Sequence, residues 1–212
     1  MLVEIFVGLC IGACGGLLCA ESRDDSRLRA VFKPVASLAF VGAGLAAGLL
    51  DSPMGTALFA GLVLSALGDI FLIPRSDRFL LAGVGAFALG HIAYSWAFLT
   101  GGVRFGLEAA SAAGATLGAG LIFLRPMRGK MGAMAAPVAI YVLIISAMVG
   151  LSVGHHVAIG APQSLQLAIG AAAFAASDLS VARDRFDGRA FINRAWGLPL
   201  YYGAQLLIAT AV

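Results

Sequence analysis

Charged residues are scarce in this sequence. Asp, Glu, Lys and Arg make up only 12% of its 212 residues, whereas 60% are hydrophobic and the mean hydropathy is +0.95. Soluble domains average about 25% charged and about 45–50% apolar residues. This balance excludes a soluble globular enzyme, a disordered chain and a nucleic-acid-binding domain. It indicates an integral membrane protein, in which the net charge of +3 reflects basic loops that set the topology.

Cysteine is also rare, and Cys10, Cys14 and Cys19 all lie in the first apolar run. Three thiols in one apolar helix, with no histidine nearby, are typical of small packing residues. We therefore expect neither a disulfide framework nor a metal site here. The same run lacks the basic start of a secretory signal peptide, because Glu4 is its only charge, and it is long for one. It is interpreted as the first membrane span.

Long apolar runs account for most of the chain. A helix crosses a bilayer with about 20 apolar residues, and eight such runs follow one another with short connections of turn-forming residues. The sequence therefore predicts an all-α fold, a polytopic membrane bundle of eight transmembrane helices in a single integral-membrane domain, residues 1–212. The predicted spans are about 2–20, 31–50, 54–74, 79–100, 105–124, 132–153, 163–182 and 191–211.

Basic residues are distributed unevenly between the two sides of this bundle. All of the 14 lysines and arginines except Arg104 lie in or beside the first, third, fifth and seventh connections. Basic loops stay in the cytoplasm, so both termini are predicted outside the cytoplasm. The short loops and the Ala- and Gly-rich composition favour a bacterial inner (plasma) membrane. The basic residues on the cytoplasmic side are Arg23, Arg27, Arg29, Lys33, Arg75, Arg78, Arg125, Arg128, Lys130, Arg183, Arg185, Arg189 and Arg194.

Four ionisable residues stand out within the predicted spans: Lys33, Asp69, His91 and Asp178. Such a residue is unfavourable in a membrane and is by default a candidate functional site. Lys33 can instead extend to the lipid headgroups, and His91 can be a neutral histidine bonded to a helix carbonyl. Asp69 and Asp178 interrupt otherwise apolar runs. Because their two spans run in the same direction, both carboxylates fall at one depth, and we expect them to face a cavity open to the cytoplasmic leaflet.

Polar residues on neighbouring spans are expected to line the same cavity. They are Tyr94, Tyr141, Ser177, Asn193, Tyr201, Tyr202 and Gln205. His155 and His156 are predicted in an outer connection instead, where they are solvated and lack a nearby third ligand for a metal ion.

A weak internal repeat relates the two halves of the chain. Lys33-Pro34-Val35 is matched by Ala136-Pro137-Val138, and a tyrosine follows each aspartate at a similar spacing, Tyr94 after Asp69 and Tyr202 after Asp178. The offset corresponds to four helices, so the two halves are expected to have the same orientation.

Several short motifs follow one another along the chain. They are Lys33-Pro34, Ser65-Ala66-Leu67-Gly68-Asp69-Ile70-Phe71-Leu72, Gly90-His91-Ile92-Ala93-Tyr94, Tyr141, Phe174-Ala175-Ala176-Ser177-Asp178 and Tyr201-Tyr202-Gly203-Ala204-Gln205. In this order they resemble the YhhN family of eight-span membrane proteins, which includes the mammalian lysoplasmalogenases. The resemblance implies hydrolysis of the vinyl ether bond of a lysoplasmalogen, a 1-alkenyl lysophospholipid, to a fatty aldehyde and a glycerophospho-ethanolamine or -choline. It also implies that Asp69 and Asp178 are the catalytic pair.

The chemistry of a vinyl ether explains why two carboxylates suit this reaction. Acid cleaves the bond: protonation of the carbon β to oxygen gives an oxocarbenium ion, which captures water and collapses to aldehyde and alcohol. The site needs a protonated donor and an anion, and two buried carboxylates can divide these tasks because desolvation and mutual repulsion keep one protonated. Such a pair titrates as a unit, so neither role is assigned to one residue.

The other polar residues are given supporting roles. Lys33 is predicted to hold the substrate phosphate as a point charge, and His91 and the tyrosines are predicted to orient water and the glycerol hydroxyl. The reaction needs no metal or cofactor, although one histidine with two aspartates would also suit a zinc ion with an open position.

Two other classes of function stay open at this point. Intramembrane Asp, His and Lys residues also serve proton-coupled transporters of small molecules or lipids. Transporter helices are usually broken near the midplane, however, whereas Pro34 and Pro137 lie in the first turns of their spans. A non-catalytic lipid-binding protein would keep its ligand after loss of either carboxylate. The partners expected for the hydrolase are a lysophospholipid substrate, water and membrane lipids, with no nucleic acid, and the oligomeric state stays open.

Overall fold

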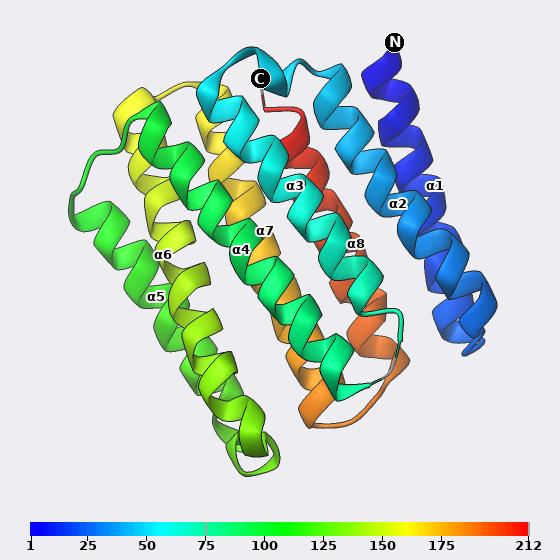
Figure 1. Cartoon of the computed structure of the whole chain (residues 1–212). Coiled ribbons are helices and arrows are strands. Elements are labelled where there is room, and N and C mark those ends of the chain that lie inside the picture. The colour runs from blue at the N-terminus through cyan, green and yellow to red at the C-terminus, as the bar shows by residue number, and fades with distance from the viewer. Residues whose placement is uncertain (75, 212) are drawn as a thin grey trace.

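The structure, a computed structural model, describes residues 1–74 and 76–211. The described chain is helical and contains no strand, as the composition predicts (Figure 1). Arg75, one of the predicted cytoplasmic basic residues, lies outside the described residues. The long helices are α1 (Leu2–Ser22), α2 (Ser26–Ala46), α3 (Pro53–Phe71), α4 (Asp77–Gly101), α5 (Leu107–Leu124), α6 (Ala135–Ile159), α7 (Pro162–Phe186) and α8 (Phe191–Ala209), and the short 3-10 helices are Leu49–Asp51, Arg125–Lys130 and Gly132–Met134.

Local chemistry sets the helix ends and accounts for their differences from the predicted spans. Helix α2 begins earlier than predicted because the Asp25 carboxylate accepts hydrogen bonds from the backbone N–H groups of Arg27 and Leu28. Helix α6 runs on to Gly160, which ends it in the left-handed conformation with φ of 70°. The extension places His155 inside α6, where it is buried and its Nδ1 bonds the carbonyl of Gly102 at 2.8 Å. The prediction of a solvated His155 in an outer connection is therefore wrong.

Seven of the described helices, α1 to α7, are long and apolar enough to cross a membrane, α5 and α6 being counted with their adjoining 3-10 turns. The chain is therefore a multi-pass helical membrane protein. Helix α8 does not qualify by these measures because it carries polar residues along its length. These residues are Asn193, Arg194, Tyr201, Tyr202 and Gln205. Helix α8 nevertheless lies inside the bundle, packed against α7, α2 and α1.

The helices pack in two similar sets of four. Helix α1 pairs with α2 and α3 with α4, as α5 pairs with α6 and α7 with α8. Between these pairs, α2 packs against α3 of its own set and α8 of the other, and its counterpart α6 packs against α7 of its own set and α4 of the other. The packing therefore repeats with the four-helix offset that the sequence repeat predicts. The match is incomplete, since α1 also packs on α8, whereas α5 packs mainly on α6.

The connections α1–α2, α3–α4, α5–α6 and α7–α8 all lie at one end of the bundle, here called the basic end, and both termini lie at the other (Figure 1). Between the ends, small residues allow close packing, as is usual between helices in lipid. At Gly61 of α3 a methyl group would lie 2.2 Å from the ring of Tyr94 on α4. Tyr94, Phe98, Phe174 and aromatic residues of α8 form much of the core that surrounds the polar site.

Candidate active site

Asp69 lies in the last turn of α3 and is only 2% exposed. Its Oδ1 forms an ion pair with the Nζ of Lys33 on α2 at 3.2 Å. Its Oδ2 accepts hydrogen bonds from the hydroxyls of Ser37 at 2.6 Å and Tyr201 at 2.8 Å. A buried charge needs a counter-charge and hydrogen bonds to remain ionised. These three donors provide both, so the site suits an aspartate anion.

Lys33 is therefore directed into the bundle. It is 9% exposed, and its ammonium forms the ion pair with Asp69. The sequence allows Lys33 either to extend to the lipid headgroups or to lie at a functional site. The structure shows that its side chain does not extend to the headgroups.

Asp178 lies on α7 in a different environment. Its Oδ2 accepts a hydrogen bond from the hydroxyl of Tyr141 on α6 at 2.7 Å and lies 3.5 Å from the Nε2 of His91 on α4. Within the described residues, Oδ1 of Asp178 accepts no hydrogen bond, and the side chain is 18% exposed. This carboxyl group has one oxygen held by the protein and one oxygen left for a proton or a ligand.

Tyr141 connects Asp178 to His91. Its single hydroxyl proton is donated to Asp178, so the contact of 2.8 Å between the hydroxyl and Nε2 of His91 requires Nε2 to be the donor. His91 is fully buried, and its Nδ1 has no hydrogen-bond partner among the described residues. A neutral imidazole with its proton on Nε2 fits this arrangement, because an unpaired acceptor then remains at Nδ1 instead of an unpaired donor.

The two carboxylates occupy corresponding places in the repeated packing. Asp69 on α3 is held from α2 and α8, and Asp178 on the counterpart helix α7 is held from α6 and α4, the counterparts of α2 and α8. The supporting groups differ: a lysine ammonium lies beside Asp69, whereas a tyrosine and a histidine lie beside Asp178. One framework thus provides two aspartates in unlike electrostatic surroundings.

Both carboxylates line a cavity of about 310 Å³. Its polar wall carries Lys33, Asp69, Tyr141, Asp178 and Tyr201, and its remaining walls are mainly apolar side chains of α4, α5, α6 and α7. Apolar walls with a few convergent polar groups are typical of a site for a small, mostly apolar ligand. The expectation that Asp69 and Asp178 share a cavity agrees with this geometry.

The other predicted site residues are placed as follows. Ser177 lines the cavity, but its hydroxyl donates to the carbonyl of Phe174 in its own helix at 2.7 Å. Five of the predicted site residues do not line the cavity. His91 contacts a lining residue, Tyr141, and Tyr94 donates a hydrogen bond to Gln205 at 2.7 Å. Asn193 donates to the carbonyl of Gly188 at 3.3 Å, and the buried hydroxyl of Tyr202 has no partner within the described chain.

The sequence pattern that defines the YhhN family matches residues 28–212. The chain belongs to the YhhN family. Its family motifs, which form a scattered set in the sequence, come together on α2, α3, α4, α6, α7 and α8 around the two carboxylates, and α1 and α5 carry none of them.

Curated relatives of this YhhN-family chain carry one enzyme name. The chain is 36% identical to "Lysoplasmalogenase TMEM86A" of Bos taurus over 165 residues, which cover 76% of this chain and 67% of that protein. It is 34% identical to the protein of the same name from Homo sapiens over 169 residues, with the same coverage. It is 32% identical over 203 residues to "Lysoplasmalogenase" of Mycobacterium tuberculosis, covering 91% of this chain and 72% of that protein. No solved structure matches the chain.

Metal binding has little support in the arrangement of side chains. Among residues 1–74 and 76–211, no group of three or more His, Cys, Asp and Glu side chains is placed so that it could hold a metal ion. Asp69 is engaged by Lys33, and His91 is directed at Tyr141 as well as Asp178.

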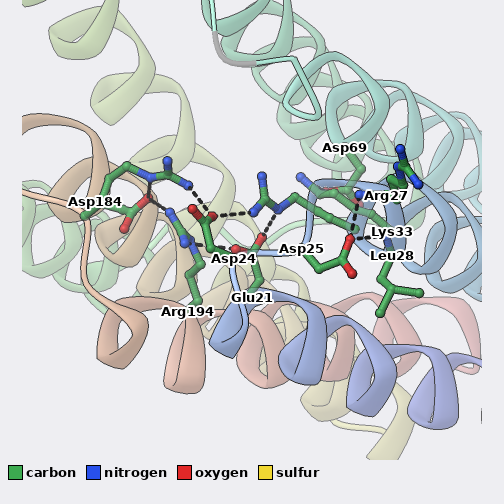
Figure 2. A network of polar contacts seen from close by, with 11 residues as sticks. Glu21, Asp24, Asp25, Arg27, Leu28, Lys33, Asp69, Asp184 and Arg194 are labelled. Atoms are coloured by element: carbon green, nitrogen blue, oxygen red, sulfur yellow. Dashed lines mark hydrogen bonds and ion pairs between the residues drawn. The ribbon is translucent and has the colours of Figure 1, made fainter.

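Sequence reasoning missed two features of the site. Ser37 binds Asp69 directly, and the available signal was its position one turn after Lys33 on the same helix face. The second feature is a charged network at the basic end (Figure 2), whose basic members serve only as topology signals in the sequence prediction. Arg29 of α2 pairs with Glu21 of α1 at 2.8 Å, and Arg194 of α8 pairs with the same carboxylate at 2.9 Å.

The charged network connects four helices beside the candidate site. Arg194 also binds Asp184 of α7, while Arg29 also binds Asp24 after α1 (Figure 2). Arg29 and Glu21 are both less than one-tenth exposed at their side chains. Since breaking a buried pair leaves an uncompensated charge, the network holds the α1–α2 turn against α7 and α8.

Proposed function

We propose that this chain is a lysoplasmalogenase-like hydrolase that cleaves the vinyl ether bond of 1-alkenyl lysophospholipids. The products are a fatty aldehyde and a glycerophospho-ethanolamine or -choline. The observation that carries the proposal is the pair of unlike carboxylates on one largely apolar cavity, in a chain similar to proteins named lysoplasmalogenase.

The surroundings of the two carboxylates support a division of roles. Asp178 is the proton donor in this proposal, because its Oδ1 accepts no hydrogen bond from the described residues and can carry the proton. Asp69 is the anion, because Lys33, Ser37 and Tyr201 all donate to it.

The reaction can then be written with every proton accounted for. Asp178 protonates the β carbon of the vinyl ether, and the resulting oxocarbenium ion is stabilised by the Asp69 carboxylate. Water adds to the carbon beside the oxygen and gives a proton to Asp69. The product of this addition is a hemiacetal. Collapse of the hemiacetal breaks the carbon–oxygen bond as Asp69 protonates the departing alcohol and the hemiacetal hydroxyl returns a proton to Asp178. Both carboxyl groups end in their starting state.

Other residues of the site have supporting roles in this proposal. Tyr141 and His91 orient Asp178 by the hydrogen-bond chain described above, and Lys33 keeps Asp69 ionised. The lipid chain lies along the apolar walls of α5 and α6. Tyr94, Asn193, Tyr202 and Gln205 shape the polar core behind the cavity. Ser177 lines the cavity, but its hydroxyl is bonded within its own helix and does not contact the reacting atoms.

The proposed topology has eight spans in a single membrane domain, residues 1–212, with α8 as the eighth. Its polar side chains are accommodated because α8 lies within the bundle. An even number of spans agrees with the placement of both termini at the end opposite the basic connections (Figure 1). By the positive-inside rule the basic end faces the cytoplasm and both termini lie outside, in a bacterial inner membrane.

Aldehyde release by the purified protein tests the function. A 1-alkenyl lysophospholipid is compared with its 1-acyl and 1-alkyl analogues, and we expect aldehyde from the alkenyl lipid alone. Asp69→Asn and Asp178→Asn should each lower the rate by about 100-fold or more, the lower range of a general acid or base contribution. Asp51→Asn, at an exposed carboxylate before α3 and so at the opposite end of that helix from Asp69, serves as the matched control.

The outcomes separate the alternatives. Full activity in both cavity variants would contradict the carboxylate mechanism. A folded wild-type protein that releases no aldehyde would contradict the hydrolase itself and direct attention to transport or to non-catalytic lipid binding.

A further inference from the structure

A second cavity, of about 540 Å³, adjoins the first at the basic end. Met134, Arg185 and Phe186 line both cavities. The second cavity lies where α4 begins, α7 ends and the α5–α6 connection folds back, three segments that are close together at this end of the bundle (Figure 1). The apolar cavity that holds the carboxylates thus continues into a space lined by charged residues.

The charges that line this second cavity are mostly positive. Arg78, Lys130 and Arg185 face a single lining carboxylate, that of Asp77. The Nη2 of Arg185 binds Asp77, and a guanidinium carries five N–H donors, so most of its donors remain for another acceptor. Among the described residues, no acidic side chain pairs with Arg78.

Lys130 is held at the edge of this cavity by its own partner. Its Nζ donates to Asp187, just after α7, at 2.8 Å, and this hydrogen bond lowers the pKa of the Asp187 carboxyl below its ordinary value. An ammonium has three donors, so two remain after this contact. Arg185 and Lys130 are therefore positioned by carboxylates and still able to bind an anion together.

The spacing along α7 relates this cationic cavity to the candidate catalytic residue. Arg185 follows Asp178 by seven residues, which is two helical turns or about 10 Å, and brings it back to nearly the same face. In a lysoplasmalogen only the glycerol backbone separates the vinyl ether oxygen from the phosphate. A lipid whose vinyl ether meets Asp178 therefore directs its phosphate toward the long side chain of Arg185.

We propose that Arg185, Lys130 and Arg78 form the binding site for the phosphate of the lysophospholipid headgroup. This inference rests on the proposed function, because it takes its ligand from that reaction. It also assigns to these three residues the role that the sequence gives to Lys33. Arg185 supplies the planar N–H groups that suit phosphate oxygens, and Asp77 positions it.

Binding of a lipid that cannot be hydrolysed tests this site apart from catalysis. The probes are 1-alkyl lysophosphatidylethanolamine and the phosphate-free 1-alkylglycerol, measured against purified protein in detergent. Arg185→Gln should raise the Kd of the first probe about tenfold, the factor expected for one charge-assisted hydrogen bond, and leave the second unchanged. Lys130→Gln should act in the same direction. Arg128→Gln is the matched control, because Arg128 lies in the same α5–α6 connection as Lys130 but lines neither cavity. This variant should bind both probes with the Kd of the wild type.

A second variant separates binding from a structural role of the Arg185–Asp77 pair. Asp77→Asn removes the ion pair that positions Arg185 but keeps the guanidinium, so probe binding should weaken much less than in Arg185→Gln. If Asp77→Asn and Arg185→Gln weaken the probe equally, the pair is structural and the proposal fails. Inorganic phosphate alone should not displace the lipid probe at concentrations similar to the lipid; if it does so through Arg185, the site binds free anions and not the lipid headgroup.

The two proposals can fail separately. An Arg185-dependent Kd for the alkyl lysophospholipid, with no aldehyde released from the alkenyl lipid, keeps the phosphate site and removes the hydrolase. Aldehyde release with an unchanged KM and an unchanged probe Kd in Arg185→Gln keeps the hydrolase and overturns the phosphate site.

Discussion

Replacing Lys33 by methionine tests the electrostatic basis of the site. Methionine keeps an unbranched stem and a good helix propensity, but it removes the ammonium that lies 3.2 Å from Asp69. Asp69 is 2% exposed and would keep only the hydroxyls of Ser37 and Tyr201. Removing one partner of a buried ion pair costs about 3–5 kcal/mol because the other charge is left uncompensated. We expect Lys33→Met to lower the free energy of unfolding by about 3 kcal/mol and to abolish turnover.

A double-mutant cycle shows whether this loss arises from Asp69. Lys33→Met combined with Asp69→Asn replaces the pair by two neutral side chains, and it should recover much of the stability but none of the activity. The free energy of unfolding is measured in detergent for the wild type, both single variants and the double variant. Lys130→Met, which removes a lysine from the exposed pair with Asp187, is the matched control and should change stability little.

One result would refute this reasoning. If Lys33→Met is as stable as the wild type, shows no coupling to Asp69, and raises KM only for phosphate-bearing lipids, then Lys33 binds the substrate phosphate. In that case the ion pair would not be needed to stabilise the Asp69 carboxylate.

Two further predictions follow from the same contacts. Tyr141→Phe removes the hydroxyl between Asp178 and His91 and should lower kcat by about tenfold to 100-fold with little change in KM; steady-state kinetics with an unchanged kcat would exclude this hydrogen-bond chain from the mechanism. Gly61→Ala places a methyl group against Tyr94 and should lower stability by about 1–3 kcal/mol. Gly85→Ala, with no atom within 4 Å, should not, and equal thermal unfolding of the two would contradict the packing described here.

Much of the fold could be predicted because hydropathy alone identifies long helices in lipid. The eight apolar runs correspond to α1 to α8, and the ends that differ depend on single residues, such as Asp25 before α2 and Gly160 after α6. The family resemblance is confirmed by the match over residues 28–212. Helix α8 has the weakest hydropathy signal of the eight, because it carries several polar residues. A helix surrounded by other helices can accommodate such residues, although they lower its mean hydropathy.

The candidate site was predictable in its members but not in its pairing. Two aspartates on spans that run in the same direction are predicted to lie at the same depth, and both line one cavity in the structure. Which groups contact each aspartate depends on helix rotation and on the packing of α2 against α3, which no spacing in the sequence reveals. Ser37 looked like any small residue of an Ala- and Gly-rich helix, and Lys33 had a headgroup position open to it.

The cavity also determines where the two products of the proposed reaction can go. It adjoins the second cavity, lined by Arg78, Lys130 and Arg185, at the basic end. In the proposed reaction the aldehyde is a single-chain hydrocarbon that would partition into the bilayer, while the water-soluble glycerophospho-alcohol would leave through the second cavity. Cleavage therefore divides the substrate at the boundary between lipid and water, and neither product needs to pass the other to leave.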